Sequence, residues 1–352
     1  MKLHSNRATA LAALLLSVSV LSACGADDTE TGTGTDDGGD TGSGGGESSL
    51  TMLPKNLGNP YFDTSTKGAE EAAGEAGASI EQVGPETGDD PAGQVPFINT
   101  VAQQGADGLI VSANDPEAIC DAIGEARDAG VKVVTFDSDT NPECRDLFIN
   151  QATAEGIAAK QLELIAEEIG GSGEIAILSA AANATNQNSW IEMMEAELES
   201  NADYADIELV DTVYGDDQDQ KSFDQTEALL QNHPDLKGII SPTTVGIAAA
   251  ARYLSESDSK GKVALTGLGT PNQMREFVED GTVSSFALWN PGDLGYLAVY
   301  ATQALIAGDI TGEEGDTFEA GKLGEFEVGA DGVVLLGEPF TFDADNIADF
   351  DF

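Results

Sequence analysis

The residues of this sequence best suited to chemistry are amides, carboxylates and hydroxyls that stand close to large aromatic side chains. Asp137 lies within Phe136-Asp137-Ser138-Asp139, and Trp289 is followed directly by Asn290. The adjacent hydroxyls of a polyol donate and accept hydrogen bonds, so planar amides and carboxylates can hold them while aromatic faces cover the C–H surface of the ring. This combination predicts a site for a small polyol such as a sugar. The segments that carry it are residues 54–63, 112–116, 136–139, 179–190, 241–244, 267–271 and 288–291.

From Leu50 onward, short apolar runs alternate with amphipathic stretches, which is the pattern of β-α units. Strands are predicted at residues 50–53, 79–83, 108–112 and 131–136, and helices at 62–76, 91–104 and 116–129. After Phe148, strands are predicted at 175–178, 207–213, 238–240 and 263–266, with helices at 155–169, 186–199, 222–232, 245–254 and 271–279. Such alternation implies a parallel sheet covered on both faces. The predicted fold class is α/β, with two doubly wound parallel-sheet lobes.

Ligands of doubly wound sheets bind beyond the carboxyl ends of the strands, where the loops converge. The seven polar segments lie at such ends, so the fold is expected to bring them together. Asn and Asp are also preferred helix N-caps, and Asn59 before Pro60 and Asp115 before Pro116 are expected to act as caps. For any single residue, capping and ligand contact explain the position equally well. Recurrence in seven segments favours binding.

The first 49 residues have the composition of an export signal followed by a tether. Lys2 and Arg7 precede an apolar run over residues 8–21, which is too short to span a membrane and leads into Leu21-Ser22-Ala23-Cys24. This resembles a bacterial lipobox and implies a signal peptide over 1–23, diacylation of Cys24 and a lipid anchor on the extracytoplasmic face of the cell membrane. An ordinary signal peptide with a chance cysteine is the alternative. Residues 24–49 are predicted to form an acidic, disordered tether after the lipidated cysteine.

The chain is strongly acidic, with 63 acidic and 15 basic residues and a net charge of −48. This charge argues against nucleic acid or an anionic lipid surface as a partner, because either would be repelled. A heavily solvated surface suited to salty or acidic surroundings is the simpler meaning of the charge. The only membrane contact expected is therefore through the lipid on Cys24.

Two cysteines remain once Cys24 is assigned to lipid. Cys120 and Cys144 are candidates for a single disulfide in an exported protein, and two free buried thiols are the alternative. A metal site is not expected, because neither cysteine has a nearby histidine and His233 adjoins Pro234 in a predicted turn.

Four segments resemble a known family, the type I periplasmic sugar-binding proteins, and among them most closely the rhamnose-binding receptors of ABC importers. They are residues 53–62, 185–188, 213–217 and 242–250, and the resemblance extends over 50–352. The autoinducer-2 receptors are a sister group that shares residues 137–140, 142–145 and 270–272. The resemblance implies two lobes joined by three hinge strands, which close over a ligand.

The resemblance also implies how the chain is divided. The hinge strands are expected to cross near residues 150–152, 288–290 and 324–326. The amino-terminal lobe then takes 50–151 plus 290–323, and the carboxyl-terminal lobe takes 152–289 plus 324–352.

Residue roles follow from the resemblance where positions match. Lys55, Asp137, Gln187 and Pro242 stand where autoinducer-2 receptors contact their ligand. Those receptors have aspartate in place of Asn186 and alanine in place of Thr244, and both departures agree with the rhamnose type. The predicted ligand-binding residues are Lys55, Asn59, Tyr61, Phe62, Asn114, Asp137, Asn186, Gln187, Trp190, Pro242, Thr244, Trp289 and Asn290.

The implied function is that of a monomeric substrate-binding lipoprotein, which carries a monosaccharide to the permease subunits of an ABC importer. L-rhamnose or a related deoxyhexose is the favoured ligand and autoinducer-2 is the alternative. The absence of an aspartate near Gly269 argues against ribose.

An enzyme is the less favoured interpretation. The segment Gly267-Leu268-Gly269-Thr270-Pro271-Asn272 lacks the third glycine of a dinucleotide fingerprint, so no cofactor is expected. Asp137 and Asp139 lie on one loop, where they are poorly placed to oppose each other across a glycosidic bond. A structural or adhesive lipoprotein would not need so many polar loops at strand ends.

Overall fold

The computed structural model describes residues 47–352. The predicted signal peptide over 1–23, the lipidated Cys24 and the tether up to residue 46 lie outside the described residues. The boundary at residue 50 is wrong by two positions, because strand β1 already begins at Ser48 and pairs Ser48 and Ser49 with strand β2. The backbone N and the hydroxyl of Ser49 also donate to Asp107 Oδ2, at 2.8 and 3.0 Å, which fixes the start of the strand.

The first lobe is built on a six-stranded parallel sheet with the order β13-β5-β4-β3-β1-β2. Its strands are β1 (Ser48–Leu53), β2 (Ala78–Gln82), β3 (Gly108–Val111), β4 (Lys132–Phe136), β5 (Leu147–Asn150) and β13 (Val333–Leu335). Its helices are α1 (Pro60–Ala76), α2 (Val95–Gln104), α3 (Cys120–Asp128) and α9 (Pro291–Ala307). The expected α/β fold with parallel sheets is confirmed.

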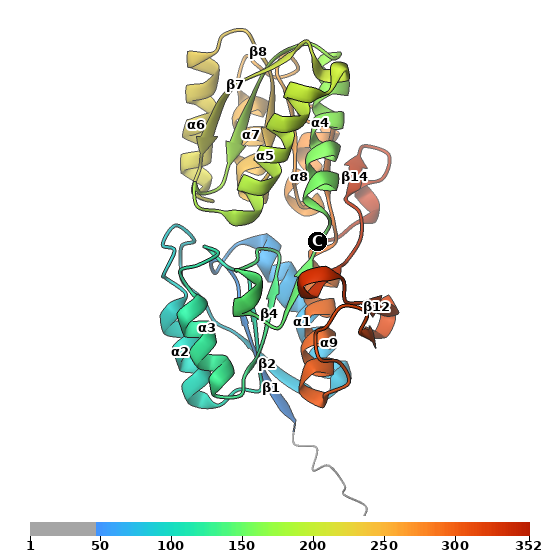
Figure 1. Ribbon diagram of the computed structural model, residues 1–352. Coiled ribbons are helices and arrows are strands. Elements are labelled where there is room, and N and C mark those ends of the chain that lie inside the picture. Colours follow the sequence, from blue (N-terminus) through green and yellow to red (C-terminus); the bar gives the residue numbers. More distant parts are fainter. Residues whose placement is uncertain (1–46) are drawn as a thin grey trace, which may run out of the picture. The chain divides into compact units, whose positions relative to one another are not determined.

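Alternation along the strands divides the apolar side chains of this sheet between two helical layers. Leu109, Val111 and Val133 are fully buried in one cluster with residues of α2 and α3, whereas Ile110 and Val134 belong to the cluster that contains α1 and α9. This is the period of two that a pleated strand imposes. Figure 1 shows α2 and α3 on one face of the sheet and α1 and α9 on the other.

Helices α1 and α9 approach each other through glycines. A Cβ placed on Gly68 would lie 1.9 Å from the carbonyl oxygen of Gly292, and one on Gly295 would lie 1.9 Å from that of Ser65. Only glycine permits such backbone contact. The contact fixes α1, which begins at Pro60, against α9, which begins at Pro291.

The second lobe contains a four-stranded parallel sheet with the order β7-β6-β8-β9, and a two-stranded antiparallel pair of β10 and β14. The strands are β6 (Gly173–Ser179), β7 (Ile207–Tyr214), β8 (Leu236–Ser241), β9 (Ala264–Gly267), β10 (Ser285–Leu288) and β14 (Phe340–Asp343). The helices are α4 (Ala154–Ile169), α5 (Thr185–Ser200), α6 (Asp219–Asn232), α7 (Thr244–Glu256) and α8 (Pro271–Glu279). A bridge between Leu268 and Ala287 joins β10 to the end of β9.

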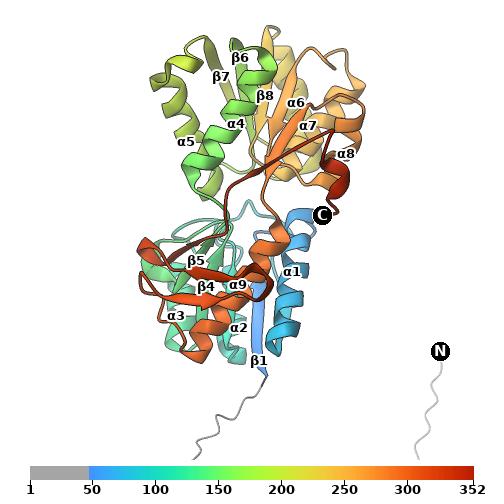
Figure 2. The same cartoon turned by 90° about the vertical axis from the view of Figure 1, so that its right-hand side faces the viewer.

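The chain passes between the two sheets after β5, after β10 and after β13. The first two passages fall at the positions expected from the sequence, but the third does not lie at residues 324–326. Strand β12 (Glu325–Glu327) instead forms an antiparallel hairpin with β11 (Thr317–Glu319), and β13 then pairs with β5 in the first sheet. The third passage therefore falls between β13 and β14, over residues 336–339 (Figure 2). Residues 324–335 belong with the first lobe, which corrects the predicted boundary.

Cys120 and Cys144 form the predicted disulfide, with Cα atoms 5.3 Å apart. Cys120 begins α3, and Cys144 ends a short 3₁₀ turn, Pro142–Cys144, that precedes β5. The bond closes a loop that holds α3 and β4. Within residues 47–352, no helix has the length and apolarity needed to cross a membrane.

Replacing both cysteines, as Cys120→Ser/Cys144→Ser, is expected to lower the free energy of unfolding by about 3 kcal/mol. Opening a loop of this size increases the conformational entropy of the unfolded chain and so stabilises the unfolded state. Urea unfolding of the two proteins measures the difference. A reducing agent should lower the stability of the wild type by a similar amount and leave the double variant unchanged. Equal stability of wild type and variant would show that the bond does not stabilise the lobe.

Glu168 provides a pH-dependent contact at the start of β10. Its carboxylate accepts hydrogen bonds from the backbone N and the hydroxyl of Ser285, at 3.2 and 3.1 Å. Burial raises the pKa of Glu168 from 4.5 to about 7, and the two hydrogen bonds only partly oppose this. Because the folded state binds the proton more tightly than the unfolded state, the stabilisation is present below pH 4.5 and is lost as the pH rises through 7.

The variant Glu168→Gln keeps an acceptor for Ser285 and removes the titration. Relative to wild type, its free energy of unfolding is expected to increase by about 2 kcal/mol between pH 5 and pH 8. Urea unfolding of both proteins across that range measures the difference. A difference that stays constant with pH would contradict the assignment of this titration to Glu168.

Candidate functional site

A small cavity of about 30 Å³, partly open to solvent, lies where loops of the two lobes meet. Its walls come from the carboxyl ends of β1, β4, β8, β9 and β10, from the segment after β7, and from the first turns of α1 and α5. This is the position at which doubly wound sheets bind ligands. The lining residues are Lys55, Asn59, Tyr61, Phe62, Asp137, Gln187, Trp190, Asp217, Pro242, Thr243, Thr244, Leu268, Leu288 and Trp289.

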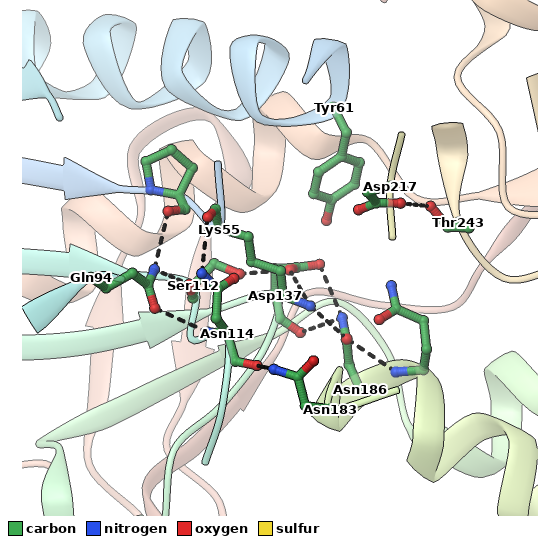
Figure 3. A network of polar contacts seen from close by, with 12 residues as sticks. Lys55, Tyr61, Gln94, Ser112, Asn114, Asp137, Asn183, Asn186, Asp217 and Thr243 are labelled. Carbon is green, nitrogen blue, oxygen red and sulfur yellow. Dashed lines mark hydrogen bonds and ion pairs between the residues drawn. The ribbon is translucent and has the colours of Figure 1, made fainter. Parts of the chain in front are cut away.

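A buried polar network surrounds Lys55. Its ammonium donates to Asn186 Oδ1 at 2.8 Å and lies 4.0 Å from Asp137 Oδ2. The hydroxyl of Ser112 donates to the same carboxylate at 2.7 Å. Figure 3 shows the side chains of Lys55, Asp137 and Asn186 together, although they come from both lobes. Burial lowers the pKa of Lys55 and raises that of Asp137, while the attraction between the two groups opposes both shifts.

Asp217 supplies a second carboxylate that the sequence did not single out. It follows β7, accepts a hydrogen bond from the Thr243 hydroxyl and has a φ of 51°. The backbone of Asp137 also lies in the left-handed region, with a φ of 61°. Non-glycine residues in this region are uncommon and gather at functional sites. Burial raises the pKa of Asp217, and Lys55 opposes the shift.

An aromatic wall covers another side of the cavity. Trp289 Nε1 donates to the Tyr61 hydroxyl at 2.8 Å, and the two rings meet edge to face with centroids 6.2 Å apart. Trp190 packs against Trp289 with centroids 6.1 Å apart. Leu268 and Leu288 add aliphatic surface beside these rings. The wall suits the C–H face of a small ring, since aromatic rings combine apolar area with a polar edge.

Gln187 leaves an open acceptor beside the cavity. The side chain is 7% exposed, and its Oε1 atom has no hydrogen-bond partner among the described residues. A buried acceptor without a donor costs about 1–3 kcal/mol. A ligand hydroxyl that reaches Gln187 would remove this cost.

Ten of the thirteen predicted residues line the cavity, and three do not. Asn186 accepts a hydrogen bond from the Lys55 ammonium, and Asn114 lines a neighbouring smaller cavity. Asn290 caps α9 by accepting from the backbone N of Gly292 at 2.9 Å and Asp293 at 3.4 Å, so its side chain is used by the helix. Asn59 also caps its helix, accepting from Tyr61 N at 3.0 Å, yet it remains in the lining.

Four lining residues were not predicted: Asp217, Thr243, Leu268 and Leu288. The two acidic residues at 216 and 217 were a detectable signal, because they directly follow a strand and a glycine. The leucines carry no such signal, since an apolar residue at a strand end is equally typical of the core. Among residues 47–352, no cluster of three or more His, Cys, Asp or Glu side chains is arranged to hold a metal ion.

A family described as periplasmic binding protein domain matches residues 50–310. The chain is 55% identical to a sugar ABC transporter protein from Actinomyces odontolyticus of known structure, with 87% of this chain and 98% of that chain covered and a TM-score of 0.72. It is 37% identical to an ABC transporter solute-binding protein from Clostridium phytofermentas with bound L-rhamnose, with 86% and 98% covered and a TM-score of 0.83.

A third similar structure is LsrB from Clostridium saccharobutylicum in complex with AI-2. The identity is 26%, with 86% of this chain and 100% of that chain covered and a TM-score of 0.82. The sister group named from the sequence is therefore among the structural relatives.

Proposed function

The chain belongs to the periplasmic binding protein family, and we propose that it is an extracytoplasmic sugar-binding protein that delivers its ligand to the permease of an ABC importer. The observation that carries this proposal is a cavity, lined from both lobes, in which buried polar groups face an aromatic wall. Two structures that resemble the chain are described as a sugar ABC transporter and as an ABC transporter solute-binding protein, which supports the proposal. Attachment to the cell membrane through Cys24, and action as a monomer, are part of the same proposal.

We favour L-rhamnose or a related deoxyhexose as the ligand. The carboxylates of Asp137 and Asp217 and the amide of Gln187 offer acceptors to ring hydroxyls. Leu268 and Leu288 beside Trp289 offer an apolar corner that suits the methyl group of a 6-deoxy sugar. The relative from Clostridium phytofermentas, which contains L-rhamnose, supports this choice.

Autoinducer-2 is the second candidate. Lys55, Asp137, Gln187 and Pro242, which match the ligand-contacting positions of its receptors, all line the cavity. Against it stands Asn186, which holds Lys55 without adding a third negative charge to Asp137 and Asp217. A site for autoinducer-2 and a site for a deoxyhexose therefore differ in the number of carboxylates that the hydrogen-bond donors of the ligand must balance.

A calorimetric panel of L-rhamnose, L-fucose, D-ribose and autoinducer-2 tests the proposal. We expect micromolar or tighter binding of L-rhamnose or a close deoxyhexose, since each satisfied hydrogen bond adds about 1 kcal/mol. The chain has two tryptophans, and both lie in the cavity wall, so ligand binding should also change the intrinsic fluorescence. Binding of autoinducer-2 without any sugar would promote the second candidate.

The same panel separates binding from catalysis. Two carboxylates that face one cavity are also a feature of glycoside hydrolases, so each sugar and its nitrophenyl glycoside should be assayed for turnover. A binding protein is stabilised thermally by its ligand and returns it unchanged. Hydrolysis would contradict the proposed function.

Asp137→Asn is expected to lower sugar affinity by about 1.5–3 kcal/mol, or roughly 10- to 150-fold. The variant keeps an acceptor for Ser112 but removes the charge that strengthens a hydrogen bond to the ligand. Calorimetry with the best sugar of the panel measures the loss.

Asp139→Asn is the matched control on the same loop. Asp139 binds Arg145, whose Nη2 lies 2.7 Å from its carboxylate, and it does not line the cavity. This variant should lower the melting temperature and leave the affinity unchanged. If Asp137→Asn instead lowers the melting temperature and binds sugar normally, Asp137 is a structural residue.

A further inference from the structure

A second, smaller cavity adjoins the first, and we call it the satellite cavity. Lys55 and Asp217 line both cavities. The remaining lining residues of the satellite cavity are Asn56, Gly88, Asn114, Ala180, Ala181, Ala184 and Asp216. It leaves room for a single water-sized group. The function proposed above does not use this space.

Two amide oxygens in the satellite cavity have no partner. Oδ1 of Asn56 and Oδ1 of Asn114 are buried and receive no hydrogen bond from the described residues. Their orientation is fixed, because the amide nitrogen of Asn114 donates to the Lys55 carbonyl at 3.0 Å and that of Asn56 donates to the Leu57 carbonyl at 3.3 Å. Both oxygens are therefore held as acceptors.

Hydrogen bonds fix both the backbone and the side chain of Asn114. It is 2% exposed, its backbone N donates to Gln94 Oε1 at 3.0 Å and its carbonyl accepts from Asn183 Nδ2 at 3.1 Å (Figure 3). The side chain cannot turn away to find water without breaking its own hydrogen bonds. The unpaired oxygen is thus a fixed feature of the folded protein.

The acceptors converge on one point beside Gly88. A Cβ placed on this glycine would lie 3.4 Å from Asn114 Oδ1, 3.8 Å from Asn56 Oδ1 and 3.7 Å from the Lys55 carbonyl oxygen. The space next to Gly88 is therefore surrounded by oxygen atoms that can only accept. A small donor placed there would remove a cost of about 1–3 kcal/mol for each unpaired oxygen.

We propose that the satellite cavity is a subsite for one hydroxyl of the bound sugar, whose hydrogen is shared between Asn114 Oδ1 and Asn56 Oδ1. This rests on the proposed function, since the two cavities share the side chains of Lys55 and Asp217 and the hydroxyl would have to enter between them. A methyl group would leave the oxygens unpaired, so the subsite directs the methyl of a deoxyhexose to the leucine corner. A cation is disfavoured because Lys55 lines the space, and Asp216 is already paired with Lys221.

Gly88→Ala tests the subsite by filling it. The added methyl would make ordinary van der Waals contacts, and Gly88 does not have a positive φ, so the fold should accept it. We expect calorimetry to show a loss of affinity of about five- to tenfold for the best sugar, equivalent to one hydrogen bond. The melting temperature without ligand should be unchanged. Gly74→Ala is the control, because its added methyl meets nothing within 4 Å.

Ligand analogues identify the hydroxyl. One of the monodeoxy derivatives, or the methyl glycoside, should bind the wild type more weakly than the parent sugar does, by the same factor. Gly88→Ala should bind that derivative and the parent sugar with equal affinity. Asn56→Ala removes one acceptor at a partly exposed position and should give a smaller loss of affinity. It tests the subsite independently if Gly88→Ala misfolds.

Equal affinity of Gly88→Ala and wild type for every sugar would overturn the subsite while leaving the proposed function intact. Affinity that depends on Na⁺ or Ca²⁺ and loses this dependence in Gly88→Ala would assign the space to a cation instead. A wild-type protein that binds no sugar would overturn both proposals.

Discussion

Burial of the Lys55 ammonium is the constraint on which the rest of the site depends. The side chain is almost fully enclosed, and an enclosed ammonium without partners is strongly destabilising. Its hydrogen-bond partner Asn186 comes from α5 of the second lobe, and its counter-charge Asp137 follows β4 of the first. The cost of burying this ammonium is therefore offset by both partners only when loops of both lobes are in place. The charge at the centre of the cavity therefore couples the arrangement of the lobes to the site.

Neighbouring features follow from this charge. Asp137 and Asp217 both face the cavity, and attraction to one lysine lowers the cost of burying two carboxylates. With two carboxylates and one ammonium, the cavity is acceptor-rich, which suits a ligand whose polar groups are hydroxyls. The aromatic wall covers another side of the cavity with low-dielectric surface, and a lower local dielectric strengthens each polar contact.

Much of this architecture could be read from the sequence, because the buried strands and amphipathic helices have distinct periods. The strands that contain Val111, Val134 and Ile177 were predicted within a few residues of their observed bounds. The third passage between the lobes was misplaced because β13 has only three residues and its identity as a strand depends on its neighbour β5. Asp217 was missed although its acidic pair follows a strand and a glycine, whereas the orientation of Asn114 depends on partners far along the chain, which no local pattern encodes.

The late position of β13 and α9 in the chain affects when the first lobe can fold. The inner face of its sheet, which includes Met52 and Ile110, is covered by α9, and the edge strand beside β5 comes from residues 333–335. A chain of which only the first 150 residues have emerged thus holds five strands, with one apolar face covered by α1 alone and the edge of β5 unpaired. Such surfaces are prone to aggregation and to slow, non-local pairing. The first lobe can therefore complete its sheet and cover it only after residues 291–335 have emerged, so a chain truncated before them lacks one helix and one edge strand of this lobe.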